Sequence, residues 1–144
     1  MAALSLASMG ALGAVAAYQT GVVRHLPEPP LPGLDADTVD ASGEAYQELK
    51  TPDAALGMLS TAATLVLAGM GDRRRATERP WLPLALAAKV GLDTAGGLFL
   101  TAEQASKHRR FCSWCLIAAA SSVAMVPQVL PEARVAWRTL RRRR

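Results

Sequence analysis

The chain has 144 residues, 51% of them hydrophobic and 19% charged, and it carries a formal net charge of +4. This length allows no more than one domain. The apolar residues are gathered in blocks, whereas a soluble helical bundle would show polar residues every three or four positions. The basic residues flank these blocks, which is typical of a membrane protein and argues against nucleic acid as a partner.

Four apolar blocks are each close to the ~20 residues that a helix needs to cross the ~30 Å hydrocarbon layer of a bilayer. Backbone polar groups in lipid must be satisfied within the segment, which favours helices. The sequence therefore predicts an all-α integral membrane protein, a single-domain four-helix bundle in contact with lipid. The predicted spans are residues 2–23, 53–71, 81–101 and 111–130.

The first block, residues 2–23, carries no charge. Its segment Ala14-Val15-Ala16 loosely resembles a signal-peptidase site, so a cleaved signal is the alternative to a retained first span. The following polar segment, residues 24–52, is predicted to be a long outer loop. Four prolines prevent regular helix in its first part, and residues 41–49 are compatible with a short helix. Residues 24–53 hold seven acidic residues against two basic ones, a net charge of −5.

The second block follows Pro52, a residue that suits the first position of a helix. Asp53 then lies near the helix N-terminus, where the dipole stabilises a carboxylate. In the third block, Lys89 and Asp93 are four residues apart and can pair on one helix face. Two interpretations stay open for this pair: it lines a polar pocket or proton path, or it is a structural pair that faces the bundle.

The only two cysteines, Cys112 and Cys115, stand at C-x-x-C spacing where the last apolar block begins. We expect Cys112 in the first turn of that helix, where the helix dipole and the neighbouring Arg109 and Arg110 favour a thiolate. Two cysteines on one helical turn can also close a disulfide on each other. The pattern favours a dithiol/disulfide redox pair.

Other interpretations of the two cysteines are weaker. A structural zinc site needs four ligands, and neither His25 nor His108 has zinc-site spacing, so no metal site is expected. Haem attachment needs a histidine at position 116, which is Leu116. Two inert buried cysteines remain an alternative, because free cysteine is often buried.

The arginines predict the orientation in the membrane. Residues 72–79 hold four arginines against two acids, and the segment 131–144 holds six against one. We expect Pro127 and Pro131 to end the fourth span and to leave 131–144 as a basic tail. The positive-inside rule puts both segments, and hence both termini, in the cytoplasm. A bacterial inner (plasma) membrane is the expected location, with Cys112 at the outer mouth and Cys115 one turn deeper.

Three segments and the order of the spans resemble the vitamin K epoxide reductase family over residues 36–130. The first is Phe111-Cys-Ser-Trp-Cys-Leu-Ile, at the start of the last span. The second is Val39-Asp40-Ala41-Ser42, similar to a loop segment of the family that ends in serine. The third is Thr51-Pro52-Asp53-Ala54-Ala55-Leu56-Gly57, similar to the family's entry into the second span.

The resemblance implies a membrane oxidoreductase that passes electrons between the C-x-x-C pair and a quinone, either ubiquinone or menaquinone, and so supports disulfide formation outside the cytoplasm. It implies that Cys115 lies beside the quinone and that Cys112 exchanges with outside thiols. Positions matching the family's quinone site are Ser42, Asp53, Gly57 and Ala119, the last of which is a ring-contacting tyrosine in some members.

One departure from the family leaves two hypotheses open. Members usually carry a second cysteine pair in the outer loop, and the matching positions here fall at Ala36 and near Pro30. In the first hypothesis, a separate extracytoplasmic thioredoxin-like thiol protein meets Cys112 directly. In the second, the chain is a non-catalytic membrane subunit or scaffold of a larger complex.

Overall fold

The computed structural model describes residues 1–40 and 52–143, and within these ranges the chain is helical. An isolated parallel bridge pairs Leu34 with Phe111. The predicted all-α class is confirmed for the described residues. The elements in order are α1 (Ala2–Gln19), α2 (Ala36–Asp40), α3 (Asp53–Gly69), α4 (Arg75–Glu78), α5 (Trp81–Glu103), the π-helical turn η2 (Gln104–His108) and α6 (Ser113–Arg143).

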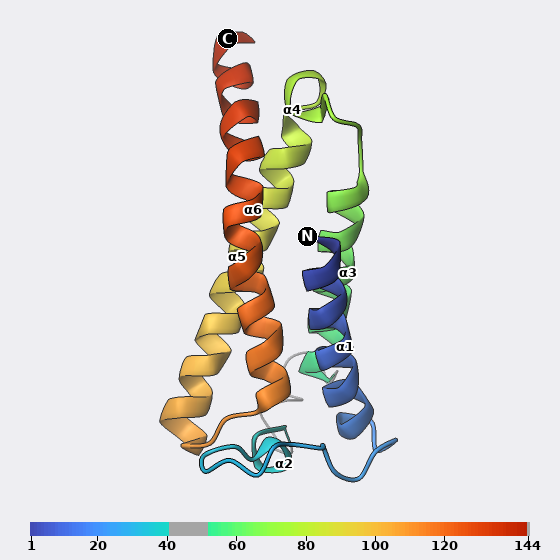
Figure 1. Cartoon of the computed structure of the whole chain (residues 1–144), viewed down its shortest axis with the longest axis vertical. Coiled ribbons are helices and arrows are strands. Elements are labelled where there is room, and N and C mark those ends of the chain that lie inside the picture. Colours follow the sequence, from blue (N-terminus) through green and yellow to red (C-terminus); the bar gives the residue numbers. More distant parts are fainter. Residues whose placement is uncertain (41–51, 144) are drawn as a thin grey trace.

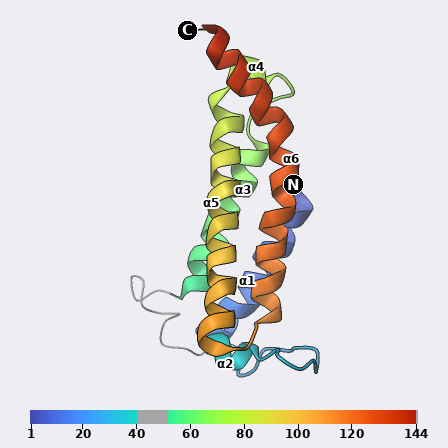
Figure 2. The same cartoon turned by 90° about the vertical axis from the view of Figure 1, so that its left-hand side faces the viewer.

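The four long helices lie side by side, with α2 at one end and α4 and the C-terminus at the other (Figure 1). Helix α1 contacts α3 and α6, and α5 contacts the same two helices. The N-terminal amine donates to Gln128 Oε1 at 2.6 Å, so α1 begins partway along α6. Figure 2 shows that α6 continues past this level, beside α4.

Three helical segments are long and apolar enough to cross a membrane: Ala2–Gln19, Trp81–His108 and Ser113–Arg143. They identify an integral membrane protein. The predicted second span is the shorter helix α3, whose 17 residues extend about 26 Å at 1.5 Å per residue. This length is at the lower limit for a transmembrane helix, so the fourth crossing stays a prediction.

The prediction that Pro127 and Pro131 break the last helix was wrong, because α6 runs through both prolines to Arg143. The end of the membrane span near residue 130 stays a prediction. Each proline removes one backbone hydrogen bond from the helix. Packing supports the helix across this stretch, where Val129 and Ala133 are buried. Residues 131–143 therefore continue the last helix past the predicted end of the span.

The end opposite the cysteines is held together by Arg75. Its guanidinium contacts the Glu132 carboxylate of α6 at 2.5 and 2.6 Å. Its Nη1 also donates to carbonyl oxygens of Leu67, Ala68 and Met70 at the end of α3, where helical carbonyls lack partners. The hydrogen bond that Arg75 donates to Glu132 raises the pKa of Arg75. One side chain thus joins α3, α4 and α6.

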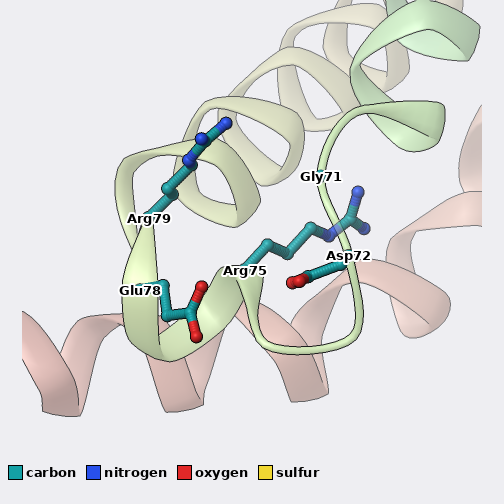
Figure 3. A pocket seen from close by; sticks show the side chains of 5 residues that line it. All are labelled: Gly71, Asp72, Arg75, Glu78 and Arg79. Atoms are coloured by element: carbon teal, nitrogen blue, oxygen red, sulfur yellow. The ribbon is translucent and has the colours of Figure 1, made fainter.

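A small cavity of about 290 Å³ lies beside this arginine. Figure 3 shows the side chains that line it, with Arg75 and Asp72 close to the turn at Gly71. Gly71 has a φ of 82°, and a Cβ there would lie 3.1 Å from Cβ of Arg75. The turn therefore needs glycine both for its backbone conformation and for the space that Arg75 takes.

Candidate active site

Cys112 directly precedes α6, as the residue that caps its N-terminus. Its Sγ accepts a hydrogen bond from the Cys115 N–H at 3.3 Å. Its own N–H donates to Gln104 Oε1 at 3.1 Å, and its carbonyl accepts from the Leu116 N–H at 3.0 Å. The expectation that Cys112 lies inside the first turn was therefore off by one position. As the cap, its sulfur still faces the unpaired N–H groups of that turn.

Cys112 is completely buried, whereas Cys115 is half-buried. The prediction that Cys112 is nearer to the outer water stays a prediction, because Cys112 is covered by the chain and Cys115 faces the cavity between the helices. Position along the helix does place Cys112 closer to the helix end, but residues 24–40 fold across that end. The apolar residues packed with Cys112 are Val15, Leu26, Ala36, Val39 and Ala54. We call residues 24–40 the loop cover.

Glu28 fastens the loop cover to the start of α6. Its Oε1 accepts from the Ser113 N–H at 2.6 Å, and its Oε2 accepts from the Ala36 N–H at 2.5 Å. The Trp114 indole donates to the Pro27 carbonyl at 3.0 Å. A carboxylate at a helix N-terminus is favoured by the dipole. Glu28 therefore connects the loop, α2 and α6 through a single side chain.

Asp37 and Phe111 hold the rest of the loop cover. The Phe111 N–H donates to the Gly33 carbonyl at 2.8 Å, and the Phe111 carbonyl accepts from the Asp35 N–H. The Asp37 carboxylate accepts from the Leu26 N–H at 2.9 Å and contacts His25 Nδ1 at 2.8 Å. The hydrogen bond from Leu26 lowers the pKa of Asp37. The Asp37 bonds thus join the two ends of the loop cover to each other, and the Phe111 bonds tie it to the segment before α6.

Asp40, at the end of α2, lies beside both cysteines. It is only 5% exposed, and its Oδ1 accepts from the Cys115 thiol at a sulfur–oxygen distance of 3.6 Å. Its Oδ2 is buried and has no hydrogen-bond partner among the described residues. Burial raises the pKa of Asp40 to about 6, with smaller contributions from the charges of Asp53 and Glu28, while hydrogen bonds from the thiols act in the opposite direction.

The sequence did not single out Asp40 as a site residue. It stands among the acids of a polar loop, and no spacing signal marks it as buried. The only available pointer was its place in the loop segment Val39-Asp40-Ala41-Ser42. Burial follows from α2, which turns Ala36, Val39 and Asp40 toward the interior.

The donor atoms of Asp40, Cys112 and Cys115 all lie within 4.8 Å of one another. Two sulfurs and one carboxylate oxygen are three of the four ligands that a structural zinc site takes. The absence of a metal at these cysteines therefore stays a prediction. The same grouping suits a dithiol with an adjacent proton acceptor.

A cavity of about 760 Å³ runs between α1, α3, α5 and α6 and reaches this cluster. Its walls include apolar side chains such as Leu12, Leu92 and Phe99. Its size lies within the range of small-molecule sites, ~300–1,000 Å³. The cavity brings together four of the predicted site residues, Cys115, Asp53, Gly57 and Ala119. Ser42, also predicted, lies outside the described residues.

Asp53 is the first residue of α3 and is exposed. Its Oδ1 accepts from Gln19 Nε2 at 2.6 Å and from the Ala54 N–H at 2.7 Å. The carboxylate therefore ties the end of α1 to the start of α3 in addition to lining the cavity.

Gly57 and Ala119 lie where helices approach closely. A Cβ at Gly57 would come within 3.1 Å of Leu12 on α1. A Cβ at Gly97 of α5 would lie 3.3 Å from both the Cα and the Cβ of Ala119. Small residues at these positions therefore keep the helices close around the cavity.

The predicted pairing of Lys89 with Asp93 is confirmed, and two hydroxyl groups of α3 also bond to the pair. Lys89 Nζ lies 2.6 and 2.7 Å from the two carboxylate oxygens of Asp93. It also donates to Ser60 Oγ at 2.7 Å. The hydroxyls of Ser60 and Thr64 in turn donate to Asp93 at 2.7 and 2.8 Å. Lys89, Asp93 and Ser60 line the same cavity as Cys115.

Comparison with known proteins gives one match. The model of the vitamin K epoxide reductase family matches residues 1–130. No curated protein and no solved structure matches the chain.

Proposed function

The chain belongs to the vitamin K epoxide reductase family, and on that premise we propose that it transfers two electrons between the Cys112–Cys115 pair and a membrane quinone. The observation that carries the proposal is the position of Cys115. Its sulfur belongs to a buried cluster with Cys112, and it lines a cavity between the helices. Members of this family are oxidoreductases of the membrane, and both features are what such chemistry needs.

The cavity suits a quinone of the ubiquinone or menaquinone type. Its apolar walls match an isoprenoid tail, and polar groups are concentrated where Cys115, Asp40 and Asp53 meet. A bound quinone supplies a two-electron, two-proton acceptor, and the protein supplies position and proton transfer. In this proposal Gly57 and Ala119 form the close-packed walls on either side of the ring.

The outward half of the reaction is a thiol–disulfide exchange. A thiolate of a separate extracytoplasmic thioredoxin-like protein attacks the Cys112 sulfur of the Cys112–Cys115 disulfide. The Cys112–Cys115 bond breaks, a mixed disulfide forms on Cys112, and Cys115 leaves as a thiolate. A second thiol of the partner resolves the mixed disulfide, and the pair is left reduced. Because Cys112 is fully covered, the partner must first displace the loop cover.

We further propose that both termini and the arginine-rich end at α4 are cytoplasmic, and that the loop cover faces outside. The positive-inside rule supports this orientation. The proposal includes α3 as a fourth crossing, since the loop cover and α4 lie at opposite ends of the helices (Figure 1). Reporter tags at both termini should be cytoplasmic, and a tag within 30–33 should be outside. A cytoplasmic tag at 30–33 would contradict the orientation.

The central experiment uses the two cysteines, which are the chain's only ones, as their own reporter. Purified protein is reduced, mixed with a short-chain quinone, and treated with a maleimide that adds mass to each free thiol. We expect the quinone to convert a two-thiol protein into one without free thiols. A dithiol that stays open with quinone, yet closes with a chemical oxidant such as diamide, would favour the scaffold hypothesis instead.

A further inference from the structure

Among the described carboxylates that line the cavity, Asp40 differs from Asp53, Asp93 and Glu103 in its bonding. Glu103 pairs with Lys107 at 2.7 Å. Asp53 accepts from Gln19, and Asp93 is bound by Lys89 and two hydroxyls. In Asp40, one oxygen accepts a hydrogen bond from the Cys115 thiol. The second oxygen is buried and has no partner in the described chain. A buried polar atom with no partner costs free energy. Such an atom beside a thiol calls for a functional explanation.

We propose that Asp40 carries protons from the cysteine thiols to the oxygens of the bound quinone. This inference rests on the proposed function and names the residue that its proton chemistry requires. The carboxylate meets the geometric requirement for a general base, because its Oδ1 is already in contact with the Cys115 thiol. It also lines the cavity, so a proton taken from sulfur does not have to cross apolar side chains.

The step balances in atoms and electrons. Two S–H bonds break and one S–S bond forms between Cys112 and Cys115, which releases two electrons and two protons. Both electrons and both protons end in the two O–H bonds of the quinol. Asp40 takes the Cys115 proton first and gives it up toward the cavity. It then takes the Cys112 proton in the same way, since both sulfurs lie within 4.8 Å of its carboxylate.

The environment of Asp40 is consistent with this cycle. Burial raises its pKa to about 6, so near neutral pH the carboxyl group both accepts and releases a proton readily. The titratable groups around Asp40 and along the adjoining cavity come from α3, α6, η2 and the loop cover. To these α5 adds three groups that line the cavity, and the full set is Asp53, Lys89, Asp93, Glu103, Lys107, His108, Cys112, Cys115 and Glu28.

Two measurements on Asp40→Asn test the proposal, and they are expected to move in opposite directions. In a Cys112→Ser background, iodoacetamide reports the thiolate at Cys115 without any quinone. Removing the neighbouring negative charge should make this alkylation about ten-fold faster at pH 7.5. In the background with both cysteines, oxidation of the dithiol by a short-chain quinone in a single turnover should be about 100-fold slower.

The matched control is Asp37→Asn, three residues earlier in the same helix. The Asp37 carboxylate bonds to residues of the loop cover and not to the cysteines. It should leave both rates within about two-fold of the parent rates. Asp40→Glu, which keeps the carboxyl group, should recover part of the quinone rate. If Asp40→Asn misfolds, Asp40→Glu still tests the idea, because it should keep a step in the pH–rate profile.

The outcomes separate this inference from the proposed function. If the unaltered protein is never oxidised by quinone, the proposed function fails. If the quinone works and Asp40→Asn reacts at the parent rate, the proton-carrying role fails alone. Alkylation of Cys115 with the same pH dependence with and without the Asp40→Asn substitution would overturn the coupling between the two groups. A parallel fall of both rates in Asp40→Asn would indicate a structural role and would also overturn it.

Discussion

Two polar groups line the same cavity, and they are satisfied to very different degrees. At one end, Lys89 and Asp93 share hydrogen bonds with Ser60 and Thr64 on the neighbouring helix. At the other end, Asp40 has one weak thiol contact and one buried oxygen without a partner in the described residues. Burying charged or polar groups is costly unless they are paired and hydrogen-bonded, and both ends need an explanation.

This difference in hydrogen bonding distinguishes a structural polar group from a reactive one. The ion pair lies within α5 and is bonded to hydroxyls of α3, so it holds the two helices together, and its donors and acceptors are already in use. An under-bonded carboxylate beside two thiols has the capacity to change protonation state. We therefore interpret the Lys89 end as structural and the Cys115 end as reactive. The following predictions test that division, from the largest expected effect to the smallest.

The largest effect belongs to the cysteines. Cys112→Ser should abolish exchange with outside thiols, a loss of at least ~10³-fold, because the attacked sulfur is removed. Cys115→Ser should trap a mixed disulfide between Cys112 and its thiol partner, visible as a reducible adduct on a non-reducing gel. Normal oxidation of an outside thiol by Cys112→Ser would show that the two roles are reversed or wrong.

The ion pair should matter for stability and not for chemistry. Lys89→Met or Asp93→Leu alone leaves one uncompensated charge and should destabilise the protein by roughly 3–5 kcal/mol. The double variant removes both charges and should recover most of that loss. Thermal unfolding in detergent measures stability, and the quinone assay measures activity. A stable double variant that cannot reduce quinone would contradict the structural interpretation and favour a proton path.

Asp40 should make stability depend on pH. Its pKa is raised from 3.8 to about 6 in the folded protein, so folding favours the protonated form. That contribution is fully present below about pH 4 and is lost as the pH rises through 6. The difference between the two pKa values corresponds to about 3 kcal/mol. Relative to the parent protein, Asp40→Asn should therefore gain stability between pH 4 and pH 8. If the difference in stability between Asp40→Asn and the parent protein were the same at pH 4 and pH 8, the buried environment of Asp40 would be contradicted.

Glu28 is the connection whose loss should expose Cys112. Glu28→Gln keeps the size of the side chain but removes the charge at the start of α6, which should cost about 1 kcal/mol. The loop cover should then open more often. Maleimide labelling of Cys112, measured in a Cys115→Ser background, should become several-fold faster. Labelling at the parent rate would mean that Glu28 does not hold the cover closed.

Asp53→Asn should have the smallest effect if Asp53 only joins α1 to α3. Asparagine keeps an oxygen that accepts from Gln19 and from the Ala54 N–H. Only an exposed charge near the helix N-terminus is lost, which costs roughly 0.3–1 kcal/mol. Quinone reduction should keep its pH profile. A changed profile, with thiol exchange at Cys112 intact, would instead place Asp53 in the proton chemistry beside Asp40.

Much of the fold followed from the sequence because lipid makes strict demands on composition. Long apolar blocks had to be helices, and three helices have the length to cross a membrane. The C-x-x-C pair was recognisable from spacing alone, since two cysteines on one turn are necessarily close. The i,i+4 spacing of Lys89 and Asp93 likewise fixed their pairing. Each of these features depends on residues that are near one another along the chain.

Tertiary contacts decided the remaining features. The continuation of α6 through Pro127 and Pro131 depends on packing along α6, which a local propensity does not include. The burial of Cys112 depends on the loop cover, whose contacts span more than 80 residues of sequence, as between Glu28 and Ser113. Asp40 meets Cys115 across 75 residues. Sequence patterns determine which segments are helical and apolar, but only the folded chain decides which side chains lose water and which partners they find.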